Sequence, residues 1–147
     1  MIPSPIFLRI FLFFIMRRDR IIVGEVRGEE ASDLLTSFNT GHEGGIATLH
    51  SNSCRDTVSR LETMVLMGME IPLEAIRRQI ASGVDILVHL GRLKDKSRKL
   101  LEVSEILGFA QGEVQLQTLF SYDYREGLQQ VNALYHTEKL ERAGMKL

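Results

Sequence analysis

The stretch IIVGEVRGEEASDLLTSF at residues 21–38 decides the fold class of this chain. It opens with a short β-branched run that ends at Gly24, a pattern typical of a strand buried on both faces. Residues 29–38 then read as a helix, and the acidic residues of its first turn suit the positive end of the helix dipole. A strand followed directly by a helix predicts an α/β fold.

The same alternation continues along the chain. Residues 46–50, IATLH, form a second short apolar run. Ser53 with Asp56 makes a capping-box pattern that opens a helix ending near Gly68. Pro72 suits the first turn of a further helix. Strand, helix, strand and helix in this order predict a parallel sheet with right-handed crossovers.

From residue 84 onward the pattern changes to consecutive strands. Residues 84–90 and 99–107 flank the polar segment KDKS at 94–97, which indicates a hairpin. Residues 113–120, EVQLQTLF, can add a third strand, and residues 130–142 have a weak helical pattern. We therefore expect an α/β fold in which parallel strands with helices precede an antiparallel hairpin region.

The composition is that of an ordinary globular domain. The chain has 147 residues, of which 44% are hydrophobic and 25% charged, with a formal net charge of -1. The single cysteine, Cys54, excludes an internal disulfide and a zinc cluster built on cysteines. The basic run at 92–99 has no interleaved aromatic residues for base stacking, so we interpret it as a solvated hairpin tip and expect no nucleic-acid partner.

The first residues form an unusual apolar leader. Residues 6–16 read IFLRIFLFFIM, a run that is too short to span a bilayer and that Arg9 interrupts. Positive charge follows this run instead of preceding it, unlike in a signal peptide. Membrane contact, a buried helix or strand, and a start foreign to the ancestral gene all stay open. We expect residues 1–15 not to pack as a core element.

Two polar residues follow the predicted parallel strands. Glu25 comes just after the first strand, and His50 ends the second. Because neighbouring parallel strands end at one edge of the sheet, where α/β proteins bind ligands, we expect both side chains at that edge. A carboxylate there can hold Mg²⁺ through water or orient an attacking water, and a histidine can donate to a phosphate oxygen. The alternative is a solvated loop glutamate and a structural histidine.

Three further residues are candidates for a position near phosphate. His42 lies in the glycine-rich segment TGHEGG at 40–45, where glycines permit close backbone approach to a ligand. Arg27 and Arg60 flank the expected site. A flexible connection and ordinary surface arginines are the alternatives for these residues.

The stretch from Met16 to about Leu107 resembles the motor ATPases of the type II/type IV secretion superfamily, and in particular their Tad-type (Flp pilus) branch. The matching segments are MRRDRIIVGEVRGEEASDLL, NTGHEGGIATLHSNS, SRLETMVLM and IRRQIASGVDILVHLGRLKDKSRKL. The resemblance implies a RecA-like domain that binds ATP and Mg²⁺ in a homohexamer. It also implies a cytoplasmic location at the inner face of the cytoplasmic membrane, beside an inner-membrane platform protein.

The same resemblance implies roles for individual residues. Glu25 matches the functional carboxylate of the Walker B strand, which would reach Mg²⁺ through water. His50 matches the histidine box near the γ-phosphate, and Arg60 matches an arginine that the family carries in the following helix. On this basis residues 16–122 are the C-terminal part of the motor domain, and residues 123–147 match the family's tail only loosely.

The sequence departs from the family at one decisive feature. No G-x-x-x-x-G-K-[ST] loop, which cradles the β- and γ-phosphates, occurs in these 147 residues. We therefore expect a truncated secretion or pilus-assembly motor ATPase that is inactive alone. One alternative is a non-catalytic binding module that joins or modulates an intact motor hexamer. Another is a membrane-associated protein whose behaviour residues 6–16 dominate.

Overall fold

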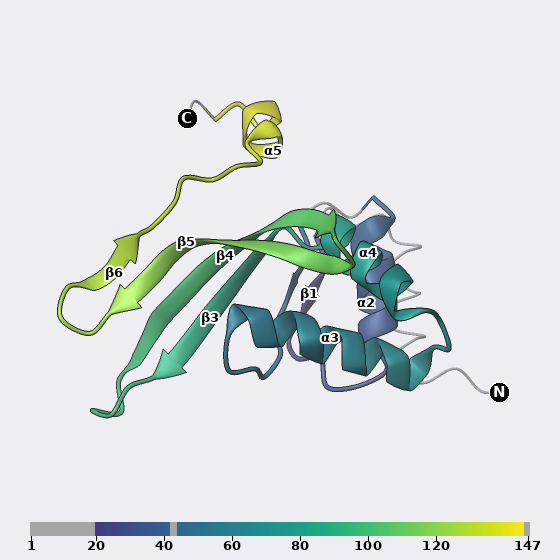
Figure 1. Ribbon diagram of the computed structural model, residues 1–147, viewed down its shortest axis with the longest axis horizontal. Helices are drawn as coiled ribbons and strands as arrows, with labels where there is room; N and C mark the ends of the chain where they lie inside the picture. Colours follow the sequence, from purple (N-terminus) through teal and green to yellow (C-terminus); the bar gives the residue numbers. More distant parts are fainter. Residues whose placement is uncertain (1–19, 42–43, 146–147) are drawn as a thin grey trace.

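The computed structural model describes residues 20–41 and 44–145. Figure 1 shows three helices gathered at one end of a long twisted sheet, whose strands extend away from them. The helices are α2 (Ala31–Asn39), α3 (Cys54–Gly68) and α4 (Leu73–Gly83). The predictions for residues 1–15 lie outside the described residues.

A small parallel sheet carries the first two strands. β1 (Ile22–Val23) pairs in parallel with β2 (Ile46–Ala47), and Ile22 stands opposite Ile46. The pairing continues past both strands, because Val26 N donates to Thr48 O at 2.8 Å. The predicted parallel neighbours are therefore confirmed, although each strand is shorter than the apolar run that predicted it.

The prediction that the first strand is buried on both faces is wrong. Ile22 is 73% exposed and Ile46 is 54% exposed, so one face of the small sheet meets solvent. Val23 and Ala47 point the other way and pack against the helices. Among the described residues, the helical core covers only the face that carries Val23 and Ala47. β1 thus has β-branched residues on both of its faces although only one face is covered.

Local capping explains where the helices begin. Ser53 is the N-cap of α3, and its Oγ accepts a hydrogen bond from Asp56 N at 3.0 Å, as the capping-box pattern predicts. Pro72 precedes the first residue of α4, where its missing N–H costs nothing. The apolar faces of these two helices meet in the core, where Val65, Ile76 and Ile80 are fully buried.

The second sheet has four antiparallel strands in the order β3-β4-β5-β6. They are β3 (Ile86–Arg92), β4 (Arg98–Ala110), β5 (Glu113–Asp123) and β6 (Gly127–Gln130). The predicted hairpin and third strand are confirmed. The sequence patterns did not indicate β6, and the predicted helix at 130–142 shrinks to α5 (Glu138–Arg142).

The two faces of this sheet have different surroundings. Leu87, Ile106 and Val114 belong to the helix-side core. Because side chains alternate along a strand, Ile86 and Val88 lie on the opposite side, which we call the outer face. Both are exposed there, by 40% and 58%. Within the described part of the chain, no helix combines the length and apolar character needed to cross a membrane.

Candidate functional site

Glu25 and His50 meet at the carboxyl ends of the parallel strands. His50 Nε2 lies 3.0 Å from Glu25 Oε1, although one residue follows β1 and the other follows β2. Thr48 anchors the second strand beside them, because its hydroxyl donates to the carbonyl oxygen of Gly24. The expectation that the two side chains share one sheet edge is confirmed in its geometry.

Arg27 is the third member of this cluster. Its guanidinium donates to Glu25 Oε2, and its backbone N–H donates to Glu30 Oε1 at 2.7 Å. The hydrogen bond from Arg27 and its positive charge, with a smaller contribution from His50, hold the pKa of the Glu25 carboxyl below its ordinary value. Glu25 is therefore an ionised carboxylate at neutral pH, which suits a role in holding a cation or water.

One oxygen of Glu25 has spare capacity to accept a hydrogen bond. Oε1 is buried, and it makes no well-aligned hydrogen bond with any group in the described structure, although His50 Nε2 is close. His50 itself has an 86% exposed side chain. An unsatisfied buried oxygen of this kind is ready to accept from a water molecule or a ligand.

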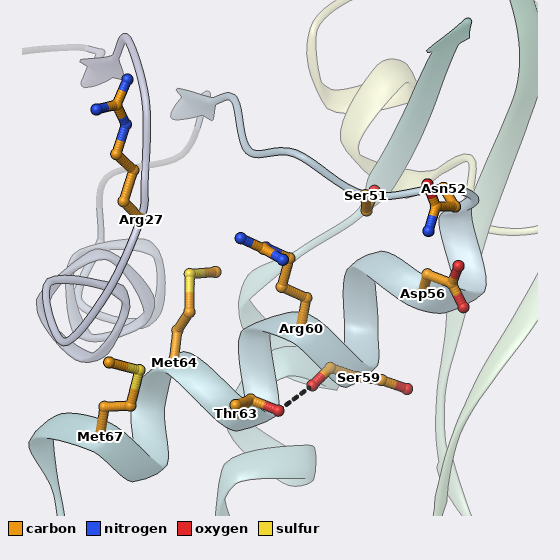
Figure 2. A pocket seen from close by; sticks show the side chains of 9 residues that line it. All are labelled: Arg27, Ser51, Asn52, Asp56, Ser59, Arg60, Thr63, Met64 and Met67. Carbon is orange, nitrogen blue, oxygen red and sulfur yellow. Dashed lines mark hydrogen bonds between the residues drawn. The ribbon is translucent and has the colours of Figure 1, made fainter.

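A pocket of about 390 Å³ adjoins the cluster. It lies between the outward side of α3 and the loop that carries Arg27, as Figure 2 shows. The side chains that line it are Arg27, Ser51, Asn52, Asp56, Ser59, Arg60, Thr63, Met64 and Met67. Arg60 extends from α3 into the space, whereas the guanidinium of Arg27 points elsewhere (Figure 2). Hydroxyl, amide and guanidinium groups therefore share the lining of this pocket with the apolar side chains of Met64 and Met67.

The structure relates most of the predicted site residues to one another. Glu25, Arg27 and His50 form the contact cluster, and Arg60 lines the pocket beside it. His42 lies outside the described residues. Sequence reasoning missed Ser51 and Asn52, although both directly follow His50 and stand at the carboxyl end of β2.

The donor set limits what kind of cation could bind here. In residues 20–41 and 44–145, no three His, Cys, Asp or Glu side chains group so that they could hold a metal ion. Mg²⁺ in nucleotide sites commonly uses only one or two carboxylates and keeps several waters and phosphate oxygens. Glu25 with its spare oxygen fits that arrangement and does not fit a cage made by protein side chains alone.

The family assignment follows from the sequence around this cluster. Residues 8–140 match the family described as type II/IV secretion system protein. The chain belongs to this family. Its α/β fold, with a parallel pair of strands and an antiparallel four-stranded sheet, agrees with the fold of a solved family member. That member is the VirB11 ATPase of the Brucella suis type IV secretion system in complex with sulphate. It superposes with a TM-score of 0.63 at 35% sequence identity, over 67% of this chain and 31% of that one.

Several relatives carry names from conjugation and type IV secretion. A protein of Mycobacterium tuberculosis (strain ATCC 25618 / H37Rv), named for a proposed role in conjugal transfer, is 42% identical over 108 residues, which are 74% of this chain and 30% of the relative. The conjugal transfer protein TrbB of Rhizobium radiobacter is 38% identical over 69% of this chain and 30% of its own length. The chain thus spans about a third of the length of these relatives.

Proposed function

We propose that this chain supplies the catalytic-carboxylate and histidine part of a type II/IV secretion motor ATPase. The observation that carries the proposal is the meeting of Glu25 and His50, at 3.0 Å, at the carboxyl edge of the parallel strands. A pocket lined by Arg27 of this cluster and by Ser51, the residue after His50, adjoins them. In P-loop enzymes this edge faces the phosphates of the nucleotide.

The roles of the residues follow from their chemistry. Glu25 is ionised and keeps one buried oxygen free to accept from water, so it would orient an attacking water or help hold Mg²⁺ through a water. His50 projects into solvent beside it and would donate a hydrogen bond to an oxygen of the γ-phosphate. Arg60 lies in the pocket and places positive charge near the phosphates. Arg27 holds Glu25 in position through their ion pair.

ATP and Mg²⁺ are the cofactors that this site would bind. Bound Mg²⁺ neutralises charge that develops on the phosphoryl oxygens. The hydroxyl and amide groups of Ser51, Asn52 and Ser59 offer further donors within the pocket. No G-x-x-x-x-G-K-[ST] loop occurs in the 147 residues, so these residues do not themselves supply the phosphate cradle.

We also propose which secretion machine this chain belongs to. We assign it to a homohexameric motor at the cytoplasmic face of a bacterial inner membrane, working with a membrane platform protein. The segments quoted from residues 16–100 favour the Tad (Flp pilus) branch. The relatives named above are conjugal transfer and type IV secretion proteins, and they support the superfamily without distinguishing that branch.

A chimera tests the proposal. The matching part of the Brucella suis VirB11 ATPase is replaced by residues 20–107 of this chain, and MgATP hydrolysis is measured. We expect the chimera to hydrolyse ATP and the added change Glu25→Gln to lower its kcat by about 100-fold or more, as for the loss of a catalytic group. Arg78→Ala, a change of an exposed residue within the transplanted part, is the control and should leave kcat unchanged. A folded, hexameric chimera in which Glu25→Gln leaves kcat unchanged would refute the role of Glu25.

A further inference from the structure

Two hairpin loops close one end of the large sheet. Residues 93–97 join β3 to β4, and residues 124–126 join β5 to β6. Because the four strands alternate in direction, both loops lie at the same end of the sheet. Figure 1 shows this end on the left, away from α2, α3 and α4. We call residues 92–99 and 122–127 together the distal end.

The distal end is positively charged, although the whole chain has a formal net charge of -1. It carries six cationic and three acidic side chains, a local charge of +3. The cations, all of them exposed, are Arg92, Lys94, Lys96, Arg98, Lys99 and Arg125. In the part of the chain that the structure describes, none of them forms an ion pair with a carboxylate. The distal end therefore presents positive charge that the described residues do not neutralise.

Two of the three acids at the distal end are bound by their own loops. Asp95 Oδ1 accepts from the backbone N–H and the hydroxyl of Ser97, at 2.9 and 2.7 Å. Asp123 Oδ1 accepts from the backbone N–H groups of Arg125 and Glu126, at 2.7 and 2.9 Å. These hydrogen bonds hold the carboxylates against the backbone of the two turns. The charged ends of the cations therefore stay available to an external anion.

Two tyrosines share the distal end with the cations. Tyr124 is 80% exposed, and the ring of Tyr122 lies edge to face with it at a centroid distance of 5.8 Å. A tyrosine has an apolar ring and a polar hydroxyl, so it suits the headgroup layer of a bilayer. Clusters of about four to eight lysines and arginines suit a membrane surface that is rich in anionic lipids. The distal end combines both features.

A nucleic acid is the other polyanion that this charge could attract. Proteins that bind single strands combine a positive groove with aromatic rings on which successive bases stack. At the distal end, no aromatic residue lies among the cations of residues 92–99, and the charges stand on the protruding ends of two hairpins (Figure 1). This arrangement favours a broad anionic surface over a strand held in a groove.

We propose that the distal end docks the protein on a bilayer that contains anionic phospholipids. The cations of residues 92–99 contact the phosphate groups, and the ring of Tyr124 enters the headgroup layer beside them. Figure 1 shows β1, which Glu25 follows, near the helices and away from the distal end. Docking in this way leaves the cluster around Glu25 open to solvent, and the inference does not depend on the ATPase role proposed for that cluster.

Cosedimentation of the full chain with vesicles tests the role of the cations. The vesicles are phosphatidylcholine alone, or phosphatidylcholine with an equal part of phosphatidylglycerol. We expect the native chain to prefer the anionic vesicles. Lys94→Gln with Lys96→Gln should lower its partition coefficient on them about 25-fold, because each lysine near such a surface contributes about fivefold. Equal partition of the native chain on both kinds of vesicle would overturn the proposal.

A matched variant separates the distal end from net charge. Arg78→Gln with Arg142→Gln removes the same charge from exposed residues elsewhere, where salt screens the membrane surface, and should change partition less than about threefold. Equal losses in the two double variants would show that net charge controls binding. Unchanged binding after Lys94→Gln with Lys96→Gln would show that another part of the chain contacts the lipid. Either result would overturn the proposal.

A tryptophan probe reports which part of the protein meets the lipid, and it requires no loss of binding. The chain has no tryptophan, so Tyr124→Trp adds a single fluorophore to the distal end. Tyr135→Trp is the matched control, because Tyr135 is 70% exposed and lies outside the distal end. We expect anionic vesicles to shift only the Tyr124→Trp emission to shorter wavelength, and brominated acyl chains to quench it. No shift for Tyr124→Trp in the bound protein would contradict the proposal.

Competition with a single-stranded DNA oligonucleotide decides between the two polyanions. At equal phosphate concentration we expect the oligonucleotide to leave the native chain on the anionic vesicles. Release of the chain from the vesicles would contradict the proposal. If Lys94→Gln with Lys96→Gln abolishes binding to the oligonucleotide but leaves partition on anionic vesicles unchanged, the distal end is a nucleic-acid surface and the proposal is wrong.

Discussion

The thiol of Cys54 lies 3.6 Å from the carbonyl oxygen of Leu87, so the first residue of α3 packs directly against β3. Glu102 of the neighbouring strand approaches the same residue, with Oε2 at 3.4 Å from Cys54 N. Burial raises the pKa of the Cys54 thiol to about 11 from an ordinary 9.0, and the negative charge of Glu102 adds to the shift. The contact thus joins the helical layer to the large sheet through a group that stays neutral.

This contact predicts how stability changes in alkaline solution. Below pH 9 the thiol is neutral in both states and contributes nothing to the pH dependence. As the pH rises from 9 to about 11, only the unfolded chain loses the proton, so the free energy of unfolding falls. Urea unfolding at pH 8 and pH 10.5 should show a larger fall for the native chain than for Cys54→Ala. The same fall in both proteins would contradict the prediction.

A second prediction concerns the cap of α3. Ser53→Ala removes the hydroxyl that accepts from Asp56 N and should lower the free energy of unfolding by about 1 kcal/mol. Urea denaturation followed by circular dichroism measures this. Ser59→Ala, on the exposed side of the same helix, keeps its carbonyl bond to Thr63 and should change stability by less than about 0.5 kcal/mol. Equal losses in both variants would show that the cap is not the cause.

These local features also explain how much of the fold could be predicted. The Ser53–Asp56 cap and Pro72 act within one turn of helix, so the sequence alone placed the starts of α3 and α4. The meeting of Glu25 and His50 was predictable for another reason. It follows from the general rule that parallel strands end at one edge, and it needs no knowledge of distant contacts.

The features that were missed depend on contacts between distant residues. In the sequence, Glu105 has the pattern of an ordinary polar residue of a hairpin. Its hydrogen-bond donors are the backbone N–H groups of Tyr135 and His136, which lie 30 and 31 residues further along the chain, so no local pattern could indicate them. Those bonds also draw residues 131–137 away from the predicted helix. The exposure of Ile22 was missed since β-branching favours a strand but cannot say whether a second layer covers it.

A third prediction concerns catalysis by the chain alone. The purified 147-residue protein should release no phosphate from MgATP above background, because the lysine and backbone cradle for the β- and γ-phosphates do not occur in its sequence. A malachite green assay measures the release. Magnesium-dependent turnover that disappears in Glu25→Gln would show that the cluster around Glu25 suffices for catalysis, and the prediction would then be wrong.

The last prediction concerns self-association through the outer face. β3 is an edge strand of its sheet, and Ile86, Val88 and Leu90 alternate along it with exposures of 40%, 58% and 70%. An edge strand with an apolar face and no charge over residues 86–91 lacks the features that prevent strand-to-strand pairing. We expect the native chain to associate at micromolar concentration, and Val88→Lys to shift it toward monomer in sedimentation velocity experiments.

Matched variants test whether the outer face at β3, or another cause such as net charge, controls self-association. Gln129→Lys adds the same charge on β6, the opposite edge strand, and should leave association unchanged. Ile22→Lys places the charge on the exposed face of the small sheet. If Gln129→Lys dissociates the protein as well as Val88→Lys does, net charge and not the β3 face controls association. If only Ile22→Lys does so, the chains meet through the parallel pair β1–β2. A native chain that sediments as a monomer throughout would refute the prediction, because the bare edge of β3 would then attract no partner.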